Sequence, residues 1–175
     1  MRRQRPEGAD TLNSKVTGMK RPQNHDRPLD EIDSRLLTLL DSNARLSMSD
    51  LARQVNLSAP SVTERLRRLE QDGVIRAFTI DVDHRRLGYA LRALVRIRPL
   101  PGNIHVVEKL LQETAQIIEC DRLTGDDAFL ARLVVRDVEE MDEILHRLAD
   151  YAVTSTAIIK STAVERRLPP IAVAD

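Results

Sequence analysis

The sequence has few aromatic residues and one cysteine, and both shortages restrict what the chain can be. Trp is absent, and aromatic residues make up 2% of the 175 residues. The core must therefore be aliphatic, and the aromatic stacking platforms of single-strand nucleic-acid binders are disfavoured. A single cysteine, Cys120, cannot form an internal disulfide, which is consistent with a reducing cytosol.

Long apolar runs and metal-ligand patterns are also missing. The sequence has no run of about 18 apolar residues, so it predicts no transmembrane helix and no membrane partner. The start "MRRQRPEGAD" has no apolar segment after its basic residues, which argues against a secretory signal. The histidines show no metal-ligand spacing, and phosphate-loop, dinucleotide and nucleophile-elbow motifs are absent. We therefore expect a cytoplasmic protein with no metal, no cofactor and no catalytic residues.

A net charge of zero hides a basic N-terminal segment. Residues 1–28 hold seven Lys or Arg and three Asp or Glu, together with three prolines and little apolar content. Such a segment cannot bury enough apolar surface to offset the entropy of ordering, so we expect a disordered basic arm. The arm is either a contact to DNA phosphates or a solvated leader. Met19 offers an alternative translation start.

Residues 29–80 have the pattern of three short helices followed by a strand. Asp30 and Ser47 are suitable N-caps for "LDEIDSRLLTLLDSN" and "LSMSDLARQVN". A third helix is expected after Ser58, in "SAPSVTERLRRLE", and should end near Gly73. The β-branched segment "VIRAFTIDVD" is expected to be a strand. A turn of about four residues between the second and third helices is typical of a helix-turn-helix, and the strand would make it a winged one.

The third expected helix has an apolar face and an arginine-bearing face. Val62, Leu66 and Leu69 follow the spacing of a buried stripe. A major groove about 12 Å wide admits one helix, so the outer face predicts binding to double-stranded DNA. A solvated surface helix would carry similar charges, but the helix-turn-helix order favours DNA. Early residues of such a helix usually read bases, and later arginines usually meet phosphates. The candidates for base-edge or sugar contacts are Ser61, Thr63 and Glu64, and those for phosphates are Arg65, Arg67 and Arg68.

From residue 90 the pattern changes to strand, helix, strand, strand, helix, strand. "ALRALVRIR" alternates between apolar residues and arginines, as a strand with one wet face does. In "NIHVVEKLLQETA" we expect Asn103 as the cap and Val106, Leu110 and Leu111 on the apolar face. The order is that of a ferredoxin-like βαββαβ domain, whose two helices cover one face of an antiparallel sheet. The uncovered face predicts a homo-oligomer.

The expected fold class is therefore α+β, with an N-terminal winged helix-turn-helix and a C-terminal ferredoxin-like βαββαβ domain. The predicted organisation is a basic arm, a DNA-binding domain, a linker, an effector-sensing and oligomerisation domain, and a tail. Their expected ranges are 1–28, 29–80, 81–89, 90–169 and 170–175.

The sequence resembles the Lrp/AsnC family of leucine-responsive and asparagine-responsive transcriptional regulators. The resemblance is carried by residues 29–83, by "LGY" at 87–89, by "ECDRLTGDDAFL" and by "TSTAIIKST". It implies a bacterial or archaeal regulator whose C-terminal domain senses small molecules, commonly amino acids. It also implies a homodimer formed by paired sheets, with dimers often assembled into octamers around which DNA bends at the nucleoid.

In members of this family the effector lies near the loop after the second strand, where this chain has "LTGDDAFL". Glycine lets backbone amides approach a carboxylate closely, and a side-chain carboxylate can hold an ammonium group. The candidates are Gly125, Asp126 and Asp127. The sequence departs from many relatives at Ala128, where they carry an acidic residue. A plain Gly-Asp turn between two strands would have the same sequence.

Two other functions stay open at this point. One is an architectural DNA-binding protein that responds to no effector. The other is an enzyme similar to the sirohaem decarboxylases, which share this architecture, with His105 or His146 as the residues to suspect. The outward arginines of the third expected helix argue against the enzyme.

Overall fold

The computed structural model describes residues 28–172 of the chain. The expected disorder of the basic arm falls on residues outside this range, apart from Pro28, and so does the end of the tail. Contacts divide the chain into two compact units. The second unit is Ile80–Glu165, and the first contains the described residues before and after it. Each unit is described by itself below.

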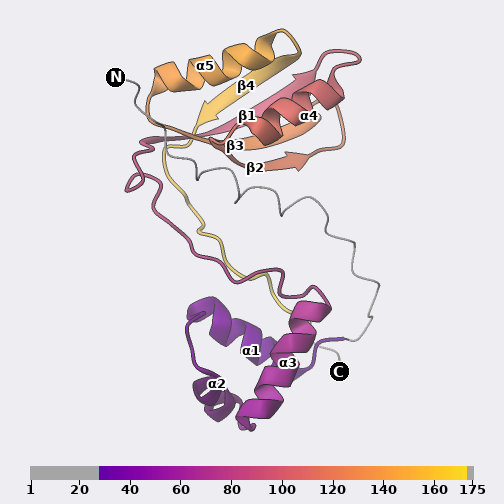
Figure 1. Cartoon of the computed structure of the whole chain (residues 1–175), viewed down its shortest axis with the longest axis vertical. Helices are drawn as coiled ribbons and strands as arrows, with labels where there is room; N and C mark the ends of the chain where they lie inside the picture. The colour runs from indigo at the N-terminus through magenta and orange to yellow at the C-terminus, as the bar shows by residue number, and fades with distance from the viewer. Residues whose placement is uncertain (1–27, 173–175) are drawn as a thin grey trace, which may run out of the picture. The chain divides into compact units, whose positions relative to one another are not determined.

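Three helices form the first unit, and each begins at the cap that the sequence predicts (Figure 1). They are α1 (Glu31–Ser42), α2 (Met48–Val55) and α3 (Ala59–Gln71). The side chains of Asp30, Ser47 and Ser58 each accept a hydrogen bond from a first-turn amide. After α3, Gly73 has a φ of +71°, the left-handed conformation that ends many helices.

An aliphatic core joins the three helices. Its buried members are Leu36, Leu40, Leu51, Ala52, Val55, Val62, Leu66 and Leu69. The predicted apolar stripe of α3 is confirmed, since Val62 is 0% exposed and Leu66 and Leu69 are each 4% exposed. The helix is therefore anchored by one face, and its opposite face is left outside this core.

The strand expected at residues 74–83 is not formed in the described chain. This prediction was wrong because a strand needs a neighbouring strand to pair its backbone groups, and the first unit holds none among its described residues. Phe78 and Ile80 remain 53% and 81% exposed. The β-propensity of this segment indicates that it would fit a pleated surface, but the propensity does not supply the partner strand.

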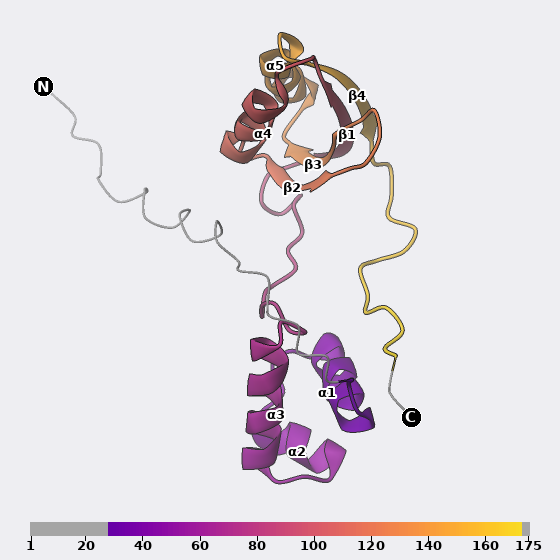
Figure 2. The same ribbon diagram turned by 90° about the vertical axis from the view of Figure 1, so that its right-hand side faces the viewer.

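The second unit has the predicted βαββαβ order. Its elements are β1 (Leu91–Pro99), α4 (Ile104–Glu113), β2 (Ile117–Arg122), β3 (Phe129–Val135), α5 (Val138–Ala149) and β4 (Ala152–Ile158). The strands form one antiparallel sheet in the order β2-β3-β1-β4. Figure 2 shows α4 and α5 on the same side of this sheet.

The alternation predicted for β1 is confirmed by its register. Ala93, Val95 and Ile97 are buried in the core between the sheet and the helices. They lie opposite Leu133, Ala131 and Phe129 of β3. The intervening arginines of β1 lie on the other face, which neither helix covers. The arginine side chains of β1 are thus available for contacts outside the apolar core.

The predicted apolar face of α4 is confirmed at Leu111, which is 4% exposed, and at Leu110, which packs against the core, but it is wrong at Val106. Val106 is 42% exposed, whereas Val107 is 0% exposed. Asn103 is the N-cap residue, but its side chain makes no cap hydrogen bond. Adjacent valines fit either phase of an amphipathic helix, so the sequence does not choose between them, and docking on the sheet does. The last strand, β4, ends at Ile158.

Candidate functional site

The face of α3 opposite its buried stripe carries the residues predicted to contact DNA. Four of them are exposed and two are partly exposed. The exposed residues are Ser61, Thr63, Arg67 and Arg68, and the partly exposed ones are Glu64 and Arg65. The six side chains come from one helix, but Arg65 is turned toward α1, and Arg67 and Arg68 are paired with Glu64.

Hydroxyl groups occupy the first turns of α3. The Ser58 and Ser61 side-chain oxygens lie 2.8 Å apart, and the Ser61 amide donates to the Ser58 hydroxyl at 3.3 Å. The Thr63 hydroxyl donates to the carbonyl oxygen of Ala59 at 3.0 Å. The Thr63 oxygen therefore keeps lone pairs for an incoming donor, while its proton is already used.

Glu64 forms ion pairs with both exposed arginines of α3. Arg67 donates from Nε at 2.9 Å and from Nη2 at 2.6 Å to the two carboxylate oxygens. Arg68 Nε donates at a longer distance, 3.4 Å. Hydrogen bonds from Arg67 in particular lower the pKa of Glu64 to about 2. The carboxylate is therefore ionised at neutral pH and offsets part of the positive charge of this face.

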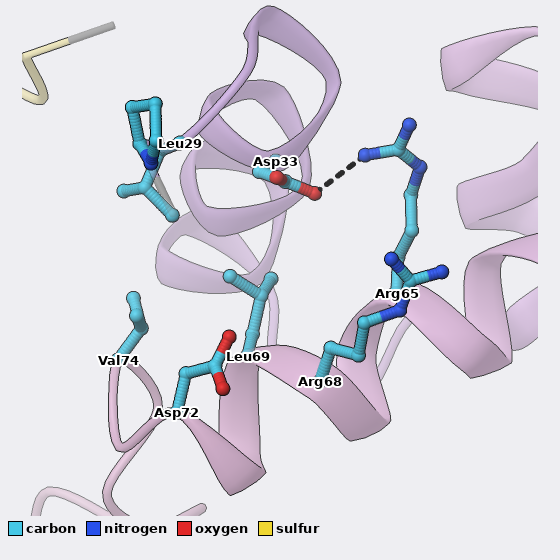
Figure 3. Close-up of a pocket in the computed structure, with 8 residues that line it drawn as sticks. Leu29, Asp33, Arg65, Arg68, Leu69, Asp72 and Val74 are labelled. Atoms are coloured by element: carbon cyan, nitrogen blue, oxygen red, sulfur yellow. Dashed lines mark hydrogen bonds and ion pairs between the residues drawn. The ribbon is translucent and has the colours of Figure 1, made fainter. Parts of the chain in front are cut away.

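Arg65 departs from the expectation that it is available to phosphates. Its Nη1 donates to Asp30 Oδ2 at 2.6 Å and to Asp33 Oδ1 at 2.8 Å, both at the start of α1. Figure 3 shows the Arg65 guanidinium directed toward Asp33. These carboxylates, Asp30 first, raise the pKa of Arg65 further above its ordinary value. In this structure the Arg65 side chain links α3 to α1. A helical wheel of α3 could not predict this pairing, because it contains no information about the position of α1.

A small pocket adjoins this ion pair (Figure 3). Its lining combines apolar and charged residues of α1, α3 and their flanks, which are Pro28, Leu29, Asp33, Arg65, Arg68, Leu69, Asp72 and Val74. Because Pro28 lines the pocket, the described chain starts beside the C-terminal half of α3.

The candidate effector residues lie in the turn between β2 and β3. Gly125 has a φ of +108°, which L-residues with a side chain rarely adopt, and the space around it is open. Arg98 of β1 lies 3.3 Å from Asp127 and 3.9 Å from Asp126. The Asp126 side chain is 89% exposed and that of Asp127 is 34% exposed. The turn and the end of β1 together present groups of both charges.

Sequence reasoning missed Arg98 as a neighbour of this turn. The alternation of β1 placed the Arg98 side chain on the solvent-facing side of the sheet, but the residues beside it depended on which strand pairs with β1. Pairing of β1 with β3 brings the start of β3 beside the end of β1, with Ile97 opposite Phe129. A prediction that combined the ferredoxin-like order with this register would have found the contact.

Metal-ligating side chains and the two histidines named for the enzyme alternative can be located in the described residues. Within residues 28–172 no group of three or more His, Cys, Asp or Glu side chains is arranged to hold a metal ion. His105 on α4 and His146 on α5 are both exposed. In the same range, no helix has the length and apolar character needed to cross a membrane.

Two family descriptions match the two units. A winged helix-turn-helix DNA-binding domain matches residues 29–76, and an Lrp/AsnC ligand binding domain matches residues 92–169. The HTH-type transcriptional regulator LrpC of Bacillus subtilis is 32% identical over 133 residues, which cover 76% of this chain and 92% of LrpC. The HTH-type regulator AldR of Mycolicibacterium smegmatis is 31% identical over 157 residues, covering 83% of this chain and 92% of AldR.

Solved structures agree with these matches. The structure of B. subtilis LrpC has a TM-score of 0.76 at 30% identity and covers 80% of this chain and 100% of its own. A feast or famine regulatory protein of M. tuberculosis, complexed with L-methionine, has a TM-score of 0.74 at 27% identity and covers 81% of this chain and 98% of its own. Helix α3 lies in the first matched region, and the turn at Gly125 lies in the second.

Proposed function

The chain belongs to the Lrp/AsnC family of DNA-binding transcriptional regulators, and from this premise we propose that the outer face of α3 binds the major groove of double-stranded DNA. The observation that carries the proposal is the division of α3 into two faces. Val62 and Leu69 are buried against the other helices, while Arg67 and Arg68 are exposed. A helix anchored by one face can enter a groove about 12 Å wide with the other.

The residues of this face have different proposed roles. The first half of α3 contacts base edges or sugars through Ser61, Thr63 and Glu64. A glutamate can accept a hydrogen bond from cytosine, and a hydroxyl group can form a hydrogen bond with either base of a pair. Arg67 and Arg68 follow and contact phosphates, since Arg presents several donors to an anion. Glu64 must release the two arginines when they meet the DNA, so its pairing with them competes with binding.

The test removes the two exposed arginines together. Arg67→Ala with Arg68→Ala should weaken binding to DNA fragments that co-purify with the protein, and should lower the slope of log affinity against log salt by about two. A matched control, Arg35→Ala with Arg147→Ala, removes the same charge from exposed sites outside α3. Equal affinity of the test variant and the wild-type chain, with helical content unchanged, would refute the proposed DNA face.

The proposed effector is an amino acid bound at the turn formed by residues 125–127. Gly125 allows the backbone amides to approach the α-carboxylate, Arg98 adds a positive charge, and Asp126 supplies a carboxylate for the ammonium group. Support comes from the match to a ligand binding domain and from the relative complexed with L-methionine. The pairing of Arg98 with Asp127 gives the turn its charge arrangement before any ligand enters.

Thermal shift with each of the twenty amino acids tests this site. One of them should raise the melting temperature, since a ligand selective for the native state stabilises it. The gain should disappear in Asp126→Asn and persist in Asp142→Asn, a change of the same charge on α5. If no amino acid raises the melting temperature, the effector is refuted and an architectural DNA-binding protein becomes the better description.

The uncovered face of the sheet is the proposed dimer interface, and dimers assemble further, up to octamers. On this face Arg96 is exposed and Val153 is 61% exposed, although Val153 lies in a strand of the sheet. Because neither helix covers this face of the sheet, a second copy of the chain is the proposed cover. Light scattering after gel filtration gives the mass, and a monomeric mass would refute the interface.

Such a regulator acts at the nucleoid, in the cytoplasm.

A further inference from the structure

Arg65 joins two carboxylates that also cap α1. The Asp30 side chain accepts a hydrogen bond from the Asp33 amide at 2.8 Å, and Asp33 accepts from the Asp30 amide at 3.4 Å. This reciprocal pair is a capping box, which defines where α1 begins. The Arg65 Nη1 group reaches both carboxylates, so we name the three residues the Arg65 bridge. The bridge ties the first turn of α1 to the middle of α3.

Burial makes this bridge a constraint on the position of α3. The side chain of Asp33 is 9% exposed and that of Arg65 is 23% exposed. A buried carboxylate without a partner is costly, so Asp33 favours arrangements of the helices that keep Arg65 in place. The pairs that Arg67 and Arg68 make with Glu64 stay within one helix and are more exposed, so they impose no such constraint between helices.

We propose that Arg65 is a positioning residue, which sets the orientation of α3 for DNA through Asp30 and Asp33 and contacts no phosphate. The inference rests on the proposed DNA face of α3. It assigns the two acidic residues of α1 a favourable part in DNA binding, even though their charges repel the phosphates. The two possible roles of Arg65 therefore predict opposite changes in DNA affinity when the charges of Asp30 and Asp33 are removed.

The sign follows from what the carboxylates do in each case. If Arg65 left the bridge to meet a phosphate, removal of the Asp30 and Asp33 charges would free it and would strengthen DNA binding. If Arg65 positions α3, the same removal loosens the helix and weakens binding to the specific site. Binding to random DNA depends mainly on charge, so it should weaken less.

The experiment compares Asp30→Asn, Asp33→Asn and Arg65→Ala in the full chain, on the co-purified DNA and on random DNA. Asn is also a good N-cap, so Asp30→Asn removes a charge while it retains a capping residue. For each variant we expect specific affinity to fall by about tenfold, with a smaller loss on random DNA. The salt slope should stay at the wild-type value in Arg65→Ala. Glu31→Gln, which removes an equal charge from an exposed site in the same turn, should not weaken binding.

Three outcomes would overturn the inference. They are equal or stronger binding by Asp30→Asn, a salt slope reduced by about one in Arg65→Ala, and an equal loss on specific and random DNA. Circular dichroism at the binding temperature shows which variants are folded, and Asp30→Asn alone decides the sign if Asp33→Asn unfolds. Failure of the DNA face itself is distinguishable, because it would appear as unchanged affinity in the Arg67→Ala and Arg68→Ala variant.

Discussion

The two units place charged residues differently around their candidate sites. In the first unit the partly buried Arg65 and the buried Asp33 link α3 directly to its scaffold. In the second unit the buried acid is Glu140, which accepts hydrogen bonds from Arg136 and from Gln116 and lies outside the candidate effector turn. The candidate effector turn has its ion pair on the surface instead, between Arg98 and Asp127.

This difference indicates which of the two candidate sites is already formed in a single chain and which needs contacts from another molecule. A helix held by a buried core and by a partly buried ion pair has its backbone in place before the ligand arrives, which reduces the ordering cost of binding. The turn at Gly125 has open space around it and a largely exposed carboxylate at Asp126. We therefore expect the DNA face to be complete in one chain and the effector turn to gain contacts from a ligand or a second copy.

The largest effect on stability should come from a Leu→Ala substitution in the core of each unit, made separately. Leu51 is 0% exposed in the first unit and Leu133 is 1% exposed in the second. Each Leu→Ala change removes buried methyl groups and leaves a cavity, so it should lower the free energy of unfolding of its own unit by about 3 kcal/mol. Amide hydrogen exchange reports on α2 and β3 in the same sample and shows whether the loss is confined to one unit.

Ile118→Ala is the control for these core variants, since Ile118 is 43% exposed and should cost under about 1 kcal/mol. If Leu51→Ala accelerates exchange in β3 as much as in α2, the units unfold together. The comparison between two separately stabilised regions would then be incorrect.

A smaller effect distinguishes the helix caps of the two units. The Ser58 side chain accepts from the Ser61 amide at the start of α3, whereas the Asn103 side chain makes no such bond at the start of α4. Ser58→Ala should therefore destabilise the first unit by about 1 kcal/mol, and Asn103→Ala should leave the second nearly unchanged. Denaturant midpoints by circular dichroism test this. Equal shifts would show that cap chemistry does not separate the units.

The sequence predicted the helices well because their signals are local. Asp30, Ser47 and Ser58 stand directly before apolar stripes, and all three cap as expected. The alternation of β1 was equally local and equally reliable. These features depend on residues within about one or two helical turns, where periodicity and capping chemistry decide the conformation.

The predictions that failed needed contacts between distant residues. The segment at 74–83 has the composition of a strand but no partner strand in the described chain. The phase of α4 depended on whether Val106 or Val107 meets the sheet. The partners of Arg65 lie more than thirty positions earlier in the chain, at separations of 35 and 32 residues. No periodicity predicts such pairs, so the different partners of the three arginines in α3 are evident only in the folded chain.

The smallest expected effect concerns Glu64, which pairs with both exposed arginines of α3. Glu64→Gln frees Arg67 and Arg68, so affinity for random DNA should rise by about threefold and the ratio of specific to random binding should fall.

Lowering the pH within the ordinary range should not increase random-DNA affinity in the way that Glu64→Gln does. The pKa of Glu64 is about 2 in the folded chain against an ordinary 4.5, so the stabilisation from its pairs is present above pH 4.5 and is lost only as pH falls toward 2. Between pH 5 and 8 the wild-type chain should show no change in random-DNA affinity from this carboxylate. Filter binding across that range, with Glu70→Gln as the matched change on an exposed acid of α3, measures both effects. An equal gain in Glu70→Gln would mean that net charge alone, and not release of the two arginines, controls the affinity of this face.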